Sequence, residues 1–320
     1  MKTSSLKKVF IRLFLATCLT VLAAGGWTFA AVHDLSDVRF LADPLVSFNI
    51  NVRGWDGNTA IFAVGPDNPY WIPFKAIPSH LYNAVLSGED FSFYSHKGVD
   101  WFELRESLLR DFRERRFARG ASTITQQLAK NLFLSRDKTI KRKVRELILA
   151  RRMEAALTKD RILELYLNVV ELGDMIYGVK TGARHHFGKQ PSELSLREST
   201  FLAAMLPGPK VYDPDRNRDL VMNRSDHLLG VMLKGQMITE DQYLAALVEV
   251  PFAGEDSDSA GPEQNFVSFE DALSATEERQ IIQEQPVGSR EDSTLDEEVF
   301  SPSEGIVEIP IEKPKVNGER

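Results

Sequence analysis

The segment that most constrains this chain is an uncharged apolar run near its N-terminus, residues 13–32. Twenty residues of α-helix rise about 30 Å, which matches the hydrocarbon thickness of a bilayer. Four basic residues precede the run, and an excess of positive charge marks the cytoplasmic side of a membrane. The sequence therefore predicts a cytoplasmic basic tail over residues 1–12, a transmembrane helix over 13–32 and an extracytoplasmic remainder.

A cleaved signal peptide is the alternative for the same run, because the small residues of TFAA at positions 28–31 resemble a cleavage site. The run is longer than the roughly 7–15 apolar residues of a signal-peptide core, which favours a retained anchor. Cys18 lies within it and is the only cysteine of the chain. Disulfides are therefore not expected in the extracytoplasmic part, although that compartment would permit them.

Charge divides the chain unevenly. Residues 251–320 contain 18 acidic and 5 basic residues, a net charge of -13, so residues 1–250 carry +6 of the total of -7. A basic domain beside an anionic membrane indicates phosphate-bearing ligands or lipid headgroups, and no nucleic acid is expected there. The acidic segment has few large apolar residues, which predicts a disordered tail that solubilises the chain or binds a partner.

Between the apolar run and residue 78 the pattern is that of strands. Apolar residues alternate over positions 46–52, WDGN supplies a turn, and a second apolar run follows at 61–64. These features predict a β-hairpin within a linker over residues 33–77, which we expect to form a collar above the membrane. From residue 78 to 250 the periodicity is helical, with capping boxes at Ser195–Glu198 and Thr239–Gln242, so one mainly α domain is predicted.

The segment RGASTITQQLAKN, residues 119–131, combines hydroxyl, amide and ammonium side chains without an acidic residue. With Ser122 as the N-cap of a helix, the apolar residues that recur every fourth position face the core: Ile124, Leu128 and Leu132. The opposite face then carries the hydrogen-bonding side chains: Thr123, Gln126, Gln127 and Lys130. This face near a helix N-terminus suits an anion attached to a sugar, and a chance polar face is the alternative.

A second segment, SGEDFSFYSHKGVD, places Glu89 directly before three aromatic residues. Aromatic neighbours would desolvate the carboxylate and raise its pKa, which makes Glu89 a candidate proton acceptor near neutral pH. His96 is expected to shape the loop that follows. A helix cap or a salt bridge is the alternative for Glu89, and a metal site with Asp90 and His96 is disfavoured because no further ligand follows at metal-binding spacing.

The third segment, DKTIKRKVRELILARRMEAAL, predicts a helix over about residues 138–157. Its basic residues cluster around one carboxylate: Lys138, Arg142, Arg145 and Glu146. Glu146 follows Arg142 by four residues, so an ordinary surface salt bridge is one interpretation. The other is a cationic wall that binds a diphosphate, with Glu146 as the candidate ligand of a divalent metal.

Together these segments resemble the family 51 glycosyltransferases, the peptidoglycan glycosyltransferases that polymerise lipid II, and look like a monofunctional, membrane-anchored member. The resemblance implies a mainly α, lysozyme-like domain over residues 78–250. Five motifs carry it, in the family's order: EDFSFYSHKG, GASTITQQLAKN, RKVRE, KDRILELYLNVVELGDMIYGVKTGARHHFGK and LRESTFLAAMLPGPKVYDP.

The resemblance also implies roles for individual residues. Glu89 would be the general base that deprotonates the 4-hydroxyl of an acceptor N-acetylglucosamine, which then attacks the anomeric carbon of the lipid-diphosphate-linked strand with inversion. Glu146 would act near the diphosphate, directly or through Mg or Mn, and no organic cofactor is expected. The basic residues that would stabilise the leaving group are Lys130, Lys138 and Arg145. The candidate substrate site is completed by Ser122, Thr123, Gln126, Gln127, Arg142 and His96.

The implied partners are lipid II, the nascent glycan strand, membrane lipid and other cell-wall synthesis or division proteins, at the bacterial cytoplasmic membrane. Residues 112–117 mix aromatic and basic side chains and are predicted to enter the lipid headgroups. The acidic segment is too short for a transpeptidase domain, so cross-linking is expected of another protein. Two alternatives remain: a lysozyme-like hydrolase, which would have no need of the cationic cluster, and an inactive membrane-tethered scaffold.

Overall fold

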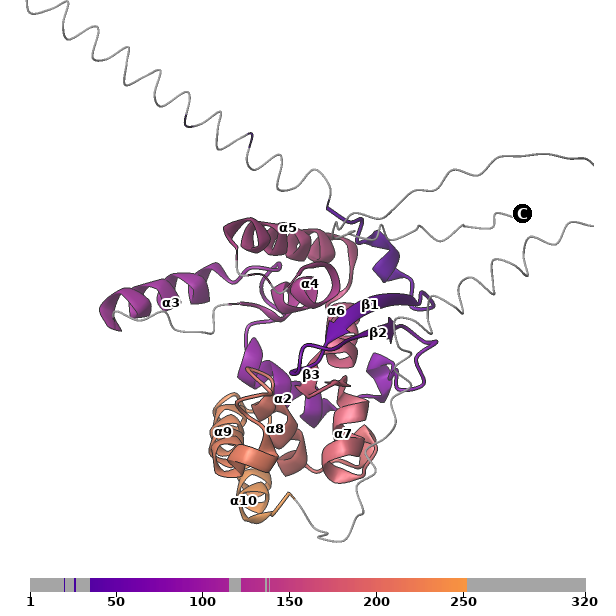
Figure 1. The fold of residues 1–320 in the computed structure, drawn as a ribbon. Coiled ribbons are helices and arrows are strands. Elements are labelled where there is room, and N and C mark those ends of the chain that lie inside the picture. Colours follow the sequence, from indigo (N-terminus) through magenta and orange to yellow (C-terminus); the bar gives the residue numbers. More distant parts are fainter. Residues whose placement is uncertain are drawn as a thin grey trace, which may run out of the picture. The chain divides into compact units, whose positions relative to one another are not determined.

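The structure is a computed structural model that describes residues 20, 26, 35–114, 122–135, 137 and 139–251. The described part is mainly helical, as predicted, and contains two small antiparallel sheets (Figure 1). Contacts divide the chain into two units, Met1–Phe269 and Glu270–Arg320, and all described residues belong to the first.

The helices follow one another along the chain with short connections. The α-helices are α2 (Ser79–Glu89), α3 (Trp101–Glu114), α4 (Ile124–Phe133), α5 (Ile140–Ala156), α6 (Lys159–Val169), α7 (Val179–Phe187), α8 (Leu196–Met205), α9 (Pro214–Lys234) and α10 (Glu240–Val248). Three short 3-10 helices accompany them: η1 (Arg39–Ala42), η2 (Phe74–Ala76) and η3 (Pro191–Glu193). The capping boxes predicted at the starts of α8 and α10 are both confirmed.

The predicted β-hairpin is also confirmed. Strands β1 (Phe48–Arg53) and β2 (Thr59–Val64) pair antiparallel, with Phe48 opposite Val64 and Arg53 opposite Thr59. A second, smaller pair, β3 (Glu171–Gly173) and β4 (Ile176–Tyr177), follows α6.

The first hairpin is an integral part of the domain and not a separate collar. Val52 and Phe62 from its inner face are buried in the same apolar core as the helices. Its turn is held by Trp55, whose indole Nε1–H donates to Glu171 Oε1 at 2.7 Å. Alternating apolar residues on a two-stranded sheet need a partner surface, and here the helices supply it. The boundary predicted at residue 78 therefore does not separate two cores.

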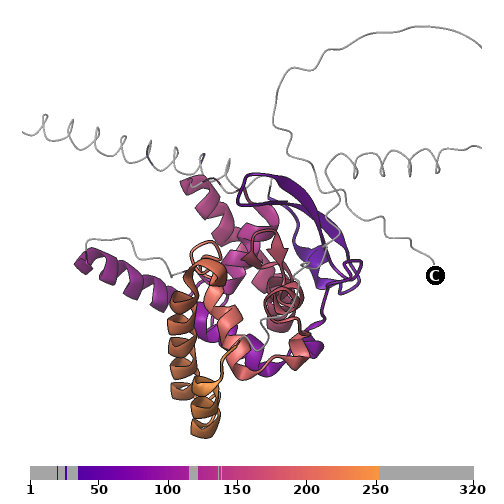
Figure 2. The same cartoon turned by 60° about the horizontal axis from the view of Figure 1, so that its bottom comes forward.

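The core is built around helices that are buried on most of their surface. Nine of the ten residues of α8 and eight of the eleven of α6 are buried. Helix α8 packs against α2, α9 and α10, while α4 packs against α5 and α6 (Figures 1 and 2). As predicted, α4 directs Ile124, Leu128 and Leu132 into this core, each worth about 1.5–3 kcal/mol of burial. This packing holds α4 against α5 and α6.

Two sequence predictions fall almost entirely outside the described residues. The transmembrane helix over residues 13–32 is described only at Thr20 and Gly26, and the acidic tail only at Pro251. Within the described ranges, no helix combines the length and apolar character that crossing a bilayer requires.

Candidate active site

The first correction concerns the start of α4, where Thr123 and not Ser122 is the N-cap. Thr123 Oγ1 accepts the Gln126 N–H at 3.2 Å, and Gln126 Oε1 accepts the Thr123 N–H at 3.2 Å. The Thr123 hydroxyl also donates to the Gly98 carbonyl at 2.8 Å. Both side chains are buried and used within the fold. The single polar face predicted for α4 is therefore divided, and Gln127 and Lys130 are the members left to face the site.

Asp90 joins the loop after α2 to the N-terminus of α4. Its Oδ2 accepts the first helical N–H, that of Ile124, at 2.9 Å, and its Oδ1 accepts from His96 Nε2 at 2.9 Å. The other ring nitrogen of His96 accepts the Gly98 N–H at 3.1 Å, so the bonding pattern implies that Nε2 carries the proton. His96 is buried with both nitrogens engaged. It shapes the loop as expected, and its contact with substrate stays a prediction.

Glu89 is the last residue of α2, and its side chain is only 8% exposed. Its Oε2 accepts from Gln127 Nε2 at 2.8 Å, whereas its buried Oε1 has no hydrogen-bond partner. Arg224 on α9 approaches Oε1 to 3.7 Å. Burial is the largest influence on Glu89 and raises its pKa above the usual value, while Gln127, Arg224 and Lys130 oppose the rise. A carboxylate of this kind can accept a proton near neutral pH.

The direction of this pKa shift is as predicted, but sequence neighbours are not its only source. Two of the aromatic residues that follow Glu89, Phe91 and Tyr94, are 58% and 54% exposed, although Phe91 lines the same cavity as the carboxylate. Further groups that surround Glu89 come from other elements, Gln127 from α4 and Arg224 from α9. Tertiary packing therefore contributes to the desolvation of this group.

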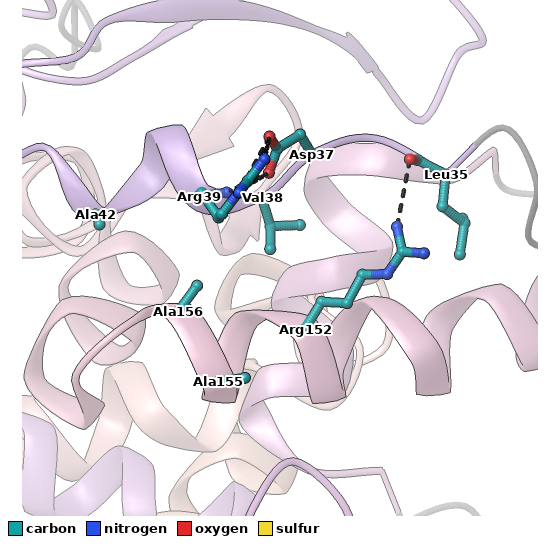
Figure 3. Close-up of a pocket in the computed structure, with 8 residues that line it drawn as sticks. All are labelled: Leu35, Asp37, Val38, Arg39, Ala42, Arg152, Ala155 and Ala156. Carbon is teal, nitrogen blue, oxygen red and sulfur yellow. Dashed lines mark hydrogen bonds and ion pairs between the residues drawn. The ribbon is translucent and has the colours of Figure 1, made fainter.

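Two cavities are prominent in the described part of the chain. One of about 240 Å³ is lined by Glu89 and by residues around the starts of α3 and α4, including Ser122 and Thr123. The other, about 740 Å³, lies between residues 35–42 and α5 (Figure 3). None of the candidate residues lines the larger one: Leu35, Asp37, Val38, Arg39, Ala42, Arg152, Ala155 and Ala156. Its one carboxylate, Asp37, is paired with Arg39 at 2.8 Å. Of the candidate residues, Glu89, Ser122 and Thr123 line the smaller cavity.

Glu146 is the second buried carboxylate, with a side chain 4% exposed on α5. Its Oε2 accepts from Arg142 Nη1 at 3.1 Å, which confirms the predicted pair four residues apart. Its Oε1 accepts from Lys143 Nζ, which also donates to Ser122 Oγ at 2.9 Å. Lys143 was not among the residues singled out from the sequence, although its position three residues before Glu146 is a helical pairing distance. It connects α5 to the start of α4.

Lys130 on α4 is close enough to both carboxylates to be affected by their charges. The charges of Glu146 and Glu89 both act on its ammonium and raise its pKa, whereas Arg142 and Lys143 lower it. The side chain reaches solvent, yet desolvation by the surrounding protein is the largest effect and lowers the pKa overall. Arg145 is half-buried on α5, and Lys138 lies outside the described residues. The cations placed around Glu146 are therefore Lys130, Arg142 and Lys143.

A metal at Glu146 would have to compete with two cationic side chains. Each carboxylate oxygen accepts a hydrogen bond from a cationic side chain, so an ion at Glu146 would share these oxygens with Arg142 and Lys143. Across the described ranges, no cluster of three or more His, Cys, Asp or Glu side chains forms a metal-binding group. The divalent cation stays a prediction, and no step below passes through it.

The site therefore contains two buried carboxylates, Glu89 and Glu146, and the helix α4, which carries Lys130. The transglycosylase family model matches residues 58–233, more than half of the chain. The chain therefore belongs to the transglycosylase family. The match begins inside the first hairpin, in agreement with the packing of that hairpin on the helices.

Individual relatives show how far the similarity extends. A biosynthetic peptidoglycan transglycosylase of Nitrosospira multiformis is 41% identical over 162 residues, 51% of this chain and 70% of that protein. Penicillin-binding protein 1A of Aquifex aeolicus is 39% identical over 184 residues, 58% of this chain and 25% of that protein. The crystal structure of penicillin-binding protein 1A from Haemophilus influenzae covers 74% of this chain and 24% of that one, with 21% identity and a TM-score of 0.35.

Proposed function

We propose that this protein is a peptidoglycan glycosyltransferase that polymerises lipid II into glycan strands. The observation that carries the proposal is the presence in one domain of Glu89, which has a buried carboxylate oxygen without a hydrogen bond, and of a cationic group around Glu146. A base on one side and cations on the other suit transfer of a sugar away from an anionic leaving group. The relatives named as peptidoglycan transglycosylases support the same activity.

The proposed reaction is a single inverting displacement. The 4-hydroxyl oxygen of the acceptor N-acetylglucosamine forms a bond to the anomeric carbon of the lipid-linked strand. The bond from that carbon to the diphosphate oxygen breaks, and its electron pair leaves with the polyprenyl diphosphate. The hydroxyl proton passes to Glu89, whose raised pKa suits it to hold that proton.

The cations would act on the leaving group. Departure of a diphosphate concentrates negative charge on its oxygens, and preplaced cations stabilise that charge without reorganising. Lys130, Arg142 and Lys143 are the described candidates, and Glu146 holds the last two in place through both of its oxygens. In this arrangement Glu146 is a positioning residue for the cationic group.

Incubation of the purified full chain with lipid II and a divalent cation tests the activity. A ladder of glycan strands on a gel is the expected result. A folded protein that gives no ladder would contradict the proposal and favour the inactive scaffold. Digestion of preformed glycan would instead indicate the lysozyme-like hydrolase.

We also propose that the protein acts at the bacterial cytoplasmic membrane, anchored by residues 13–32 with its catalytic domain outside the cytoplasm. The apolar run supports this, and α3 adds a second membrane contact. At 100° per residue, Trp101, Phe102 and Leu109 share one face of α3, and all three are exposed, the first two by 66% and 68%. Figure 1 shows α3 projecting from the helices around α4. The flank predicted over residues 112–117 has no described side chain apart from Arg113.

Spin labels test the contact of α3 with lipid. In a Cys18→Ser background, Phe102→Cys carries one label and Val248→Cys, an 83% exposed apolar position on α10, carries the matched control. In vesicles of phosphatidylethanolamine and phosphatidylglycerol, the label at position 102 should be accessible to oxygen and shielded from a water-soluble nickel complex. Equal nickel accessibility at both positions would contradict membrane insertion of α3.

A further inference from the structure

We propose that Tyr166 is a positioning residue for Glu89 that acts through Gln127, and that this relay makes Oε1 of Glu89 the atom that accepts the proton. The inference rests on the proposed function, in which Glu89 is the base. It identifies a residue on α6, away from the cavity lining, as part of the arrangement that prepares the base.

The relay consists of two hydrogen bonds through one amide. The Tyr166 hydroxyl donates to Gln127 Oε1 at 3.2 Å, and Gln127 Nε2 donates to Glu89 Oε2 at 2.8 Å. An amide has one accepting end and one donating end, so a flipped Gln127 would place its oxygen against the carboxylate. Because Tyr166 occupies the accepting end, the donating end stays directed at Glu89.

Tyr166 is well suited to remain a donor. Its side chain is fully buried in the core of the domain, on a helix that packs against α4. Burial, followed by the charges of Glu89 and Asp90, raises the pKa of its hydroxyl well above the usual value. The hydroxyl therefore keeps its proton over the whole working pH range, and the orientation of Gln127 does not change with pH.

The consequence for Glu89 is that its two oxygens differ. Oε2 is occupied by Gln127, whereas Oε1 is buried without a hydrogen-bond partner. The charged groups that act on Glu89 are Arg224 from α9, Lys130 from α4 and the adjacent Asp90. The two cations lower the pKa of Glu89, and Asp90 raises it. Among the groups that oppose the effect of burial, the hydrogen bond from Gln127 lowers this pKa the most. A correctly oriented Gln127 thus lowers the pKa of the base and leaves Oε1, which Arg224 approaches to 3.7 Å, as the oxygen without a hydrogen bond.

Tyr166→Phe removes the donor while keeping the ring that fills the core. Gln127 is then free to turn, and Glu89 loses part of the stabilisation of its charged form. The acid limb of kcat/KM for lipid II should move to higher pH by about one unit, with activity recovering at alkaline pH. Tyr177→Phe is the matched control, because Tyr177 is also buried and its hydroxyl donates to the Arg53 carbonyl at 3.4 Å, on the first hairpin. Its acid limb should stay at the wild-type position.

A direct titration separates this inference from the proposed function. The full chain in detergent, labelled with 13C at glutamate carboxyl carbons and assigned with Glu89→Gln, reports the pKa of Glu89 without any turnover. Tyr166→Phe should raise that pKa in the wild-type background and cause no further change in a Gln127→Met background. An unchanged pKa, or an equal rise in both backgrounds, overturns the relay even if the enzyme is active. A shifted pKa in a protein that never extends lipid II keeps the relay and overturns only the proposed function.

Discussion

Replacing Glu89 by Gln is expected to lower kcat for lipid II polymerisation by about 10²–10⁴-fold, with little change in KM. The amide has nearly the shape of the carboxylate but accepts no proton from the acceptor hydroxyl. Wild-type activity should also fall as the pH drops through the raised pKa of Glu89, so its acid limb lies above the value of an ordinary glutamate. Initial rates of glycan synthesis against pH measure both effects.

Stability distinguishes lost chemistry from lost folding in this variant. The pKa of Glu89 is higher in the folded than in the unfolded chain, so its ionised form costs stability once the pH exceeds the unfolded value. Glu89→Gln removes that cost and should unfold at the same or a higher temperature than the wild type. Glu240→Gln, an exposed carboxylate at the start of α10, is the control and should change neither property. Full activity of Glu89→Gln would exclude Glu89 as the base.

Local features of this structure could be predicted from the sequence because they depend on near neighbours along the chain. The apolar stripe of α4 follows from helical periodicity, and the first hairpin follows from alternation around a turn. The pair of Arg142 and Glu146 follows from helical spacing alone. Each of these needs no knowledge of what packs against it.

The cap of α4 was missed although the sequence contained the signal. Ser122 and Thr123 are adjacent and either hydroxyl can cap a helix, but Gln126 stands three residues after Thr123, which is the capping-box spacing. The pair of Lys143 and Glu146 also had a sequence signal. Residues three apart on a helix are as close as residues four apart, and Lys143 precedes Glu146 by three.

The surroundings of Glu89 could not be predicted, because they come from residues far away in the sequence. Tyr166 reaches it through Gln127, and Arg224 approaches from α9. No local sequence pattern indicates that either residue contacts the site. Tyr166, for example, fits the pattern of an ordinary core residue of α6. The burial that raises the pKa of Glu89 is therefore a property of the assembled fold.

Replacing Glu146 by Gln is expected to lower kcat/KM for lipid II by about 10²–10³-fold, the range seen when one preplaced electrostatic group is lost. The charge of Glu146 holds the side chains of Arg142 and Lys143 beside its buried carboxylate. A neutral amide at this position would release both cations toward solvent. The cations remain in the protein, so binding of the anionic substrate should change less than kcat. Separate measurement of kcat and KM on lipid II tests this division.

The matched control for Glu146→Gln is Glu198→Gln on α8. Glu198 is buried to a similar degree and pairs with Lys189 at 2.7 Å, but it lies outside the candidate site. If loss of a buried ion pair acted only through stability, both variants would keep wild-type activity per folded molecule, which would contradict the proposed role of Glu146. If Glu146 acts by placing Lys143, then Lys143→Met should cost far less activity in the Glu146→Gln background than in the wild type, because the lysine has already lost its position.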